Sequence, residues 1–333
     1  YMQKKMMQKA IKKYRIELII FLAALVLRMI ALFIFLWIAK QHNFVFFESG
    51  SDSQSYIALG KNILDRGEFT RFATSPFLPE TFRTPGYPLF ISFFLFLCNT
   101  IIAVSLAQAI LASLAAVIVY KIGRENFSLR VGIASAALSV IDPVGIYLSG
   151  QILSETTFTF FLLLSIYFFL RSTKKYSYTH FLAAGLFLGC ATLIRPVGQL
   201  LPIVYAGLLI SSPGFGRVKD RVVSLLLFVV VFLIVIAPWS LRNKMIFNSW
   251  QLSDVGIHNF YWYHVPSFYA EKNNMSEEDV RQQLERRRFE LDPSATKHVS
   301  VRDTPFQSQI VYDYIRENPL AFAEFYAVKT IPF

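Results

Sequence analysis

The sequence predicts an all-α protein that crosses a membrane several times and carries further helices outside the bilayer. Apolar residues make up 54% of the 333 residues and charged residues only 17%, whereas a soluble domain carries about 25% charged residues. Several apolar stretches are long enough to cross a hydrocarbon core of about 30 Å. Short clusters of Lys and Arg separate these stretches, as cytoplasmic loops do. The composition excludes disorder and collagen-like repeats and argues against an ordinary soluble enzyme.

The first predicted span covers residues 18–39, an apolar stretch whose only charged residue before its end is Arg28. The segment 1–17 before it is basic, so the positive-inside rule predicts a cytoplasmic amino terminus. A cleavable signal peptide is disfavoured, because its apolar region covers only about 7–15 residues and a small-residue cleavage site would follow. A guanidinium in the middle of a span needs a partner or a water-filled cavity, and Arg28 is expected to have one.

The segment 101–239 is predicted to complete the transmembrane bundle. Basic patches divide its apolar stretches near residues 121–130, 171–175 and 217–221. If these patches are cytoplasmic, the chain crosses an even number of times between neighbouring patches. The stretches between them are too long for one span and are expected to form hairpins, so the total is seven spans.

Local signals predict where the helices of these stretches end. Asp142-Pro143 and Arg195-Pro196 mark helix ends, because a proline disfavours the helical conformation of the residue before it. The Cys98-Asn99-Thr100 break divides another apolar stretch into a short interfacial helix at 86–97 and a span that begins at residue 101.

Two long segments are predicted to lie on the outer face of the membrane. Residues 40–100 form an outer loop with amphipathic and interfacial helices, and residues 240–325 form a second outer loop with short helices. Residues 326–333 have the composition of the first turns of a further, truncated span, which suggests that the chain is a fragment. The net charge of +11 is mostly a topology signal, so nucleic acid is not an expected partner.

This topology gathers most of the reactive ionisable residues on the outer side of the membrane. They are Asp52, Arg83, Glu155, Arg195, Arg242, His258 and His264. Ionisable groups near a membrane are costly to bury, so their convergence is a functional hint.

Asp52 lies in the first turn of an amphipathic helix predicted for residues 51–66, one turn before Tyr56. A carboxylate at a helix start interacts favourably with the helix dipole, by about 0.3–1 kcal/mol. That structural role is the simpler interpretation of the spacing. A carboxylate facing lipid headgroups is also placed to act as a general base.

Glu155 has the same two interpretations, since it begins a predicted span: a dipole-paired acid, or a second acid, a hydroxyl clamp or a metal ligand. Arg83, Arg195 and Arg242 either anchor helix ends at the interface or bind a lipid phosphate, which arginine does through two parallel hydrogen bonds. His258 and His264 flank an aromatic cluster that is typical of an interfacial belt. No metal-ligand spacing is present, and the use of a divalent metal ion stays open.

Five short motifs occur in an order that resembles the GT-C glycosyltransferases, especially the branch with aminoarabinose transferases and protein O-mannosyltransferases. They are Ser-Asp-x-x-x-Tyr at 51–56, Arg-Thr-Pro-Gly-Tyr-Pro at 83–88, Ser-Glu at 154–155, Leu-Ile-Arg-Pro at 193–196 and Pro-Trp-x-x-Arg-Asn at 238–243. The resemblance covers about residues 15–330. The Trp-Trp-Asp-Tyr-Gly motif of oligosaccharyltransferases is absent, which counts against that subgroup.

The resemblance implies an integral membrane enzyme of a bacterial or archaeal plasma membrane, with its active site on the outer face. Such enzymes take a sugar from a polyprenyl-phosphate carrier and pass it to a lipid, glycan or protein acceptor, inverting the anomeric centre. It implies that Asp52 is the catalytic base, with Glu155 as a second candidate. Tyr56 and the three arginines are the candidate substrate and phosphate ligands, and membrane lipids are expected neighbours.

Two other functions are compatible with the sequence. A transporter or flippase of a lipid-linked glycan would place its ionisable site near the bilayer midplane, where only Arg28 is predicted. A structural scaffold of the envelope would tolerate the loss of Asp52 and Glu155.

Overall fold

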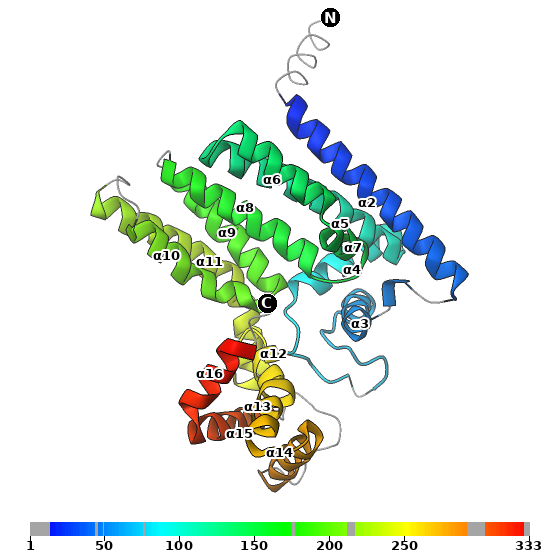
Figure 1. Ribbon diagram of the computed structural model, residues 1–333, viewed down its shortest axis with the longest axis vertical. Helices are drawn as coiled ribbons and strands as arrows, with labels where there is room; N and C mark the ends of the chain where they lie inside the picture. The colour runs from blue at the N-terminus through cyan, green and yellow to red at the C-terminus, as the bar shows by residue number, and fades with distance from the viewer. Residues whose placement is uncertain are drawn as a thin grey trace, which may run out of the picture. The chain divides into compact units, whose positions relative to one another are not determined.

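A computed structural model describes residues 14–43, 46–48, 50–75, 77–174, 177–211, 217–291 and 304–329. These residues form helices and loops, and none of them lies in a β-strand, which confirms the all-α prediction. The chain divides into two compact units, whose helices are drawn in Figure 1. Unit 1 comprises Tyr1–Leu78 and Thr84–Trp239, and unit 2 comprises Pro79–Arg83 and Ser240–Phe333.

Four helices among the described residues are long and apolar enough to cross a membrane. They are α2 (Arg15–Gln41), α5 (Ile101–Asn126), α8 (Glu155–Lys174) and α11 (Val218–Phe247). Helix α2 contains the whole of the predicted first span, and α5 begins at the predicted residue 101. Helix α11 continues through Pro238 beyond the predicted boundary at residue 239.

Other apolar segments of unit 1 are shorter or bent. Helices α6 (Leu129–Ile141) and α7 (Pro143–Gly150) meet at an angle of 53°, and they add a fifth span only if the bent pair is counted as one. Helix α9 (Tyr178–Ile194) and the pair η2 (Pro196–Leu200) and α10 (Leu201–Ser211) are apolar but shorter. By length and composition, four or five spans are supported, so the count of seven stays a prediction.

The break between α6 and α7 explains the buried Arg28. Pro143 has no N–H group, so the carbonyl of Ser139 one turn earlier lacks its helical donor. Arg28 Nη2 donates to this carbonyl at 3.2 Å, and its Nη1 donates to Ala24 O at 3.2 Å. The Asp142 carboxylate caps the start of α7 by accepting from two backbone N–H groups. The helix end predicted at Asp142-Pro143 therefore supplies the partner that was expected for Arg28.

The basic patches lie at one end of unit 1. Arg124 Nη1 at the end of α5 lies 3.6 Å from Glu17 Oε1 at the start of α2. Tyr167 near the end of α8 donates to Glu125 Oε1 at 3.2 Å. The ends of α8 and α10 and the starts of α9 and α11 lie at this same end, away from α3 (Figure 1). The lysines at positions 4–13, which belong to the predicted cytoplasmic segment, lie outside the described residues.

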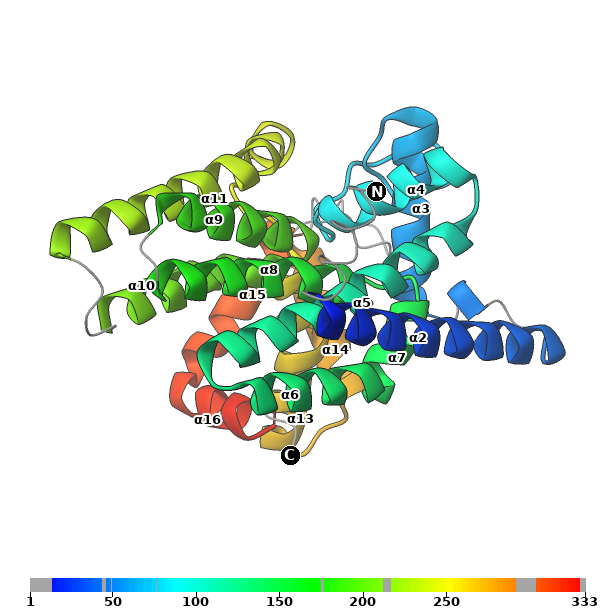
Figure 2. The same ribbon diagram turned by 90° about the horizontal axis from the view of Figure 1, so that it is seen from above.

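The opposite end of unit 1 carries α3 (Ser51–Arg66) and α4 (Gly86–Cys98), which lie side by side (Figure 2). A Cβ atom on Gly60 of α3 would lie 2.5 Å from Ile91 Cγ2 of α4, so only glycine allows this approach. Helix α4 matches the predicted helix at 86–97 to within one residue, and Asn99 ends it in the left-handed conformation with φ 49°; its interfacial position stays a prediction.

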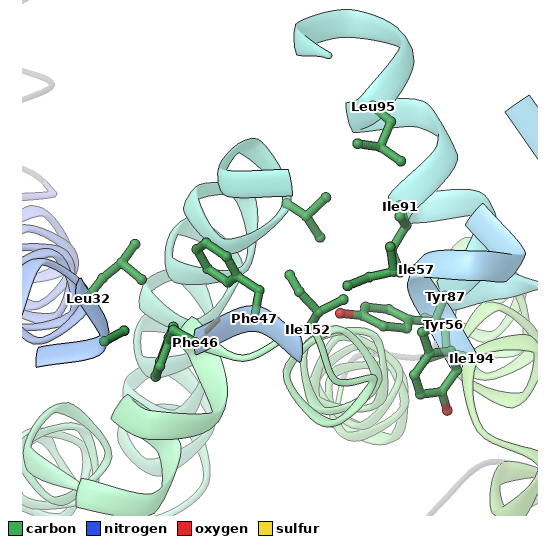
Figure 3. Packing of buried hydrophobic residues seen from close by; sticks show 12 residues of the cluster. Leu32, Phe46, Phe47, Tyr56, Ile57, Tyr87, Ile91, Leu95, Ile152 and Ile194 are labelled. Carbon is green, nitrogen blue, oxygen red and sulfur yellow. The ribbon is translucent and has the colours of Figure 1, made fainter. Parts of the chain in front are cut away.

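A buried apolar cluster joins these two helices to the bundle. Figure 3 shows it running from Leu32 of α2 through Phe46 and Ile152 to Tyr56 and Tyr87. Phe46 belongs to the short helix η1 (Phe46–Glu48), which follows α2. The cluster fixes α3 against the rest of unit 1, because buried apolar side chains interdigitate closely.

Unit 2 consists mainly of short helices around their own core. These are α12 (Val255–Asn259), the π-helix η3 (Phe260–His264), α13 (Val265–Asn273), α14 (Glu277–Leu291), α15 (Thr304–Glu317) and α16 (Pro319–Lys329). Tyr261 donates to Glu285 Oε1 at 2.8 Å, and the fully buried Arg288 binds both oxygens of the same carboxylate. Short helices follow α11, which ends at Phe247, whereas the outer-loop position of residues 240–325 and a span beginning at 326 stay predictions.

Candidate active site

The structure brings three of the predicted site residues together at the α3–α4 end of unit 1. Tyr56 OH donates to Ser154 Oγ at 3.2 Å. Arg195 Nη1 lies 2.6 Å from Glu155 Oε1 and 3.5 Å from Ser154 Oγ. Tyr56 and Ser154 are buried, whereas Glu155 and Arg195 are partly exposed. We call Tyr56, Ser154, Glu155 and Arg195 the Ser154 cluster.

Helix ends position the charged members of this cluster. Glu155 is the first residue of α8, where the helix dipole favours a carboxylate. Arg195 directly follows α9 in an extended conformation, and Pro196 prevents the helix from continuing. The two side chains meet because α8 and α9 pack side by side, so that the start of α8 lies beside the end of α9.

Two residues of the Arg-Thr-Pro-Gly segment pin the start of α4 to the end of α9. Thr84 Oγ1 donates to the carbonyl of Ile194 at 3.0 Å, which is one of the last carbonyls of that helix. A Cβ atom on Gly86 would lie only 2.7 Å from Leu193 O. Thr84 and Gly86 therefore hold the backbone on which Arg195 depends, which gives both residues a structural role.

A buried polar network holds Tyr87, the ring against which Tyr56 packs. The ring of Tyr56 packs edge-on against Tyr87, with ring centroids 4.8 Å apart. Tyr87 OH donates to Gln108 Oε1 at 2.5 Å, and Gln108 Nε2 donates to Gln151 O at 2.5 Å in the loop before α8. Gln108 was not among the predicted site residues, although a polar side chain inside the apolar span at 101–126 is a signal for such a role.

Asp52 lies in the first turn of α3 and is exposed. It precedes Tyr56 by four residues, so the two side chains share one side of the helix, about 6 Å apart along its axis. Asp52 therefore lies one turn before Tyr56, which is the member of the Ser154 cluster that α3 carries.

Arg83 and Arg242 lie in unit 2 and have contacts of their own. Arg242 Nη1 donates to Glu80 O at 2.7 Å and to Asn243 Oδ1 at 2.9 Å. Arg83 lies over the ring of Phe82, 4.7 Å from its centre. The contacts of Arg242 fit the structural interpretation, since the side chain holds a loop carbonyl.

His258 and His264 of unit 2 lie among aromatic rings. His258 packs against Phe82 at 4.8 Å, and His264 packs against Phe260 at 5.1 Å. Burial lowers the pKa of His264, which keeps its imidazole neutral near pH 7. Within the described ranges, no three His, Cys, Asp or Glu side chains gather where they would share a metal ion.

The apolar helices of unit 1 define an integral membrane protein. Residues 82–241 match the family model of dolichyl-phosphate-mannose-protein mannosyltransferases, over slightly less than half of the chain. The match includes Arg83, Glu155 and Arg195, whereas Asp52, Tyr56 and Arg242 lie outside it. A comparison with curated proteins gives no match. The family match and the apolar helices together indicate a membrane glycosyltransferase.

Proposed function

We propose that the protein transfers a sugar from a polyprenyl-phosphate carrier to an acceptor hydroxyl or similar nucleophile at the outer membrane face, with inversion at the anomeric carbon. The observation that carries the proposal is the Ser154 cluster, which pairs an arginine with a carboxylate and includes Tyr56, one helical turn after Asp52. The cluster lies at the end of unit 1 opposite the basic patches, which the positive-inside rule assigns to the cytoplasm. The match to a mannosyltransferase family supports this chemistry.

The proposed reaction is a direct displacement. The acceptor oxygen forms a bond to the anomeric carbon while the bond from that carbon to the phosphate oxygen breaks. The acceptor proton passes to the Asp52 carboxylate, and the electron pair of the broken bond stays on the leaving phosphate. Arg195 stabilises the negative charge that develops there.

The other predicted residues have supporting roles in this proposal. Tyr56 holds the Ser154 hydroxyl beside Arg195, and Glu155 holds the guanidinium itself. Arg83 and Arg242 stay predicted phosphate ligands. A lipid-embedded carrier accounts for the apolar helices, because a long isoprenoid tail keeps the donor in the bilayer.

A transfer assay with a panel of polyprenyl-phosphate sugars tests the base. Replacing Asp52 by Asn is expected to lower kcat by about 10²- to 10⁴-fold, because general-base catalysis typically contributes that factor. Asp65→Asn is the matched control, since Asp65 is an exposed acid in the last turn of the same helix. Full turnover of the Asp52→Asn enzyme would refute the proposed base. Glycan movement across the bilayer without a new glycosidic bond would favour a flippase.

A further inference from the structure

In the ion pair between Arg195 and Glu155, only one of the two carboxylate oxygens has a partner within the described part of the chain. Arg195 Nη1 lies 2.6 Å from Glu155 Oε1. Glu155 Oε2 is buried and has no hydrogen-bond partner among the residues that the structure describes. Burying a charged oxygen without a donor costs free energy. The pair is therefore held through one oxygen only.

A ligand can reach both partners, because 38% of the Arg195 side chain and 37% of the Glu155 side chain are exposed. A salt bridge exposed to this degree shifts an equilibrium by only about 1.4-fold to 5-fold. A phosphate group forms two parallel charge-assisted hydrogen bonds with a guanidinium. A carboxylate held through one oxygen is a weaker competitor for the same guanidinium.

We propose that Glu155 occupies the anion-binding face of Arg195 before the donor binds, and that the donor phosphate replaces it. This inference rests on the polyprenyl-phosphate donor of the proposed function. Glu155 is then a positioning residue, because it acts on the substrate through Arg195. It holds the guanidinium 3.5 Å from Ser154 Oγ, where the phosphate meets it.

The same exchange governs release of the product. When the bond from the anomeric carbon to the phosphate oxygen breaks, a singly charged phosphodiester becomes a phosphate monoester with an additional negative charge. The monoester binds Arg195 more strongly than the donor does, because attraction increases with charge. Glu155 competes with the monoester for the guanidinium and so speeds its departure. Removing the charge of Glu155 is expected to lower both KM and kcat.

Binding of farnesyl phosphate to the full chain in detergent tests this exchange, with farnesol as the matched ligand without phosphate. Glu155→Gln is expected to bind farnesyl phosphate about 1.4-fold to 5-fold more tightly than the unmodified protein. The difference is expected to shrink between about 0.05 M and about 0.5 M salt, since screening weakens the competing pair. Glu155→Asp keeps the charge on a shorter side chain and is expected to bind with intermediate affinity.

Two controls separate the outcomes. Glu17→Gln removes an acid from the ion pair with Arg124 at the opposite end of unit 1, and its affinity is expected to be unchanged. Unchanged farnesol affinity shows that a variant is folded. If the unmodified protein prefers farnesyl phosphate and Glu155→Gln binds it equally or more weakly, the exchange is refuted while the proposed function stands. If the unmodified protein binds both ligands equally, the proposed donor chemistry fails, and the exchange fails with it.

Discussion

The Ser154 hydroxyl connects two predicted site residues that are distant in the sequence. It accepts a hydrogen bond from Tyr56 and lies 3.5 Å from Arg195 Nη1. Ser154 is only 2% exposed, so water does not readily replace a lost partner. Ser154 therefore links Tyr56 of α3 to Arg195, the cation that is proposed to bind phosphate.

Tyr56→Phe removes the donor to Ser154 and keeps the buried ring. A net hydrogen bond contributes about 0.5–1.5 kcal/mol, so kcat/KM is expected to fall by about 2-fold to 13-fold in the transfer assay. Tyr147→Phe serves as the control, because Tyr147 is 43% exposed and lies in α7. If Tyr56 acts through Ser154, adding Ser154→Ala to Tyr56→Phe costs much less than Ser154→Ala alone. Fully additive losses would contradict this linkage.

At the scale of helices, close approaches of backbone decide where the site residues lie. Gly86 brings α4 against the end of α9, and Gly60 brings α3 against α4. These contacts hold the helices that carry Tyr56 and Arg195. They depend on side-chain volume rather than on charge.

Gly86→Ala is expected to destabilise unit 1 by about 1–3 kcal/mol, because its Cβ atom would lie 2.7 Å from Leu193 O and the backbone must move. A lower thermal unfolding temperature in detergent and a lower kcat/KM are expected together. Gly207→Ala is the matched control, since a Cβ atom there meets no atom within 4 Å. Equal unfolding temperatures of the two variants would exclude a tight α4–α9 contact.

The break between α6 and α7 makes a second prediction at this scale. Arg28→Leu removes the donor to Ser139 O, and an unpaired buried carbonyl costs about 1–3 kcal/mol. Pro143→Ala restores a backbone N–H one turn after Ser139, so the carbonyl regains a donor. The destabilisation by Arg28→Leu, measured by thermal unfolding, is therefore expected to be smaller in the Pro143→Ala background. Independent effects of the two changes would refute the pairing.

For the whole molecule, the two ends of unit 1 differ in charge and in chemistry. Arg124 and Glu125 lie at one end, and the Ser154 cluster lies at the other. The positive-inside rule converts this difference into a predicted orientation, with the basic end in the cytoplasm.

Labelling with a membrane-impermeant maleimide in intact cells measures this orientation. In a background with Cys98 and Cys190 replaced by serine, cysteines at the exposed positions of Gln54 and Gln199 are expected to react. Cysteines at the exposed positions of Arg130 and Lys174 are expected to react only after the cells are opened. Labelling of positions 54 and 199 from opposite sides would refute a common outer-face site.

The sequence alone determined the helices and their breaks, since these depend on local composition. Pro143, Pro196 and Asn99 marked helix ends that the structure contains, because proline and turn geometry act within a segment, whereas α11 continues through Pro238 past the predicted boundary at residue 239. Only the tertiary structure decided the partners: Tyr56 with Ser154, Arg195 with Glu155, and Arg28 with Ser139. These residues are far apart along the chain, and no local pattern encodes which helix ends meet. Their pairing follows from packing, in which glycines at close approaches select one arrangement.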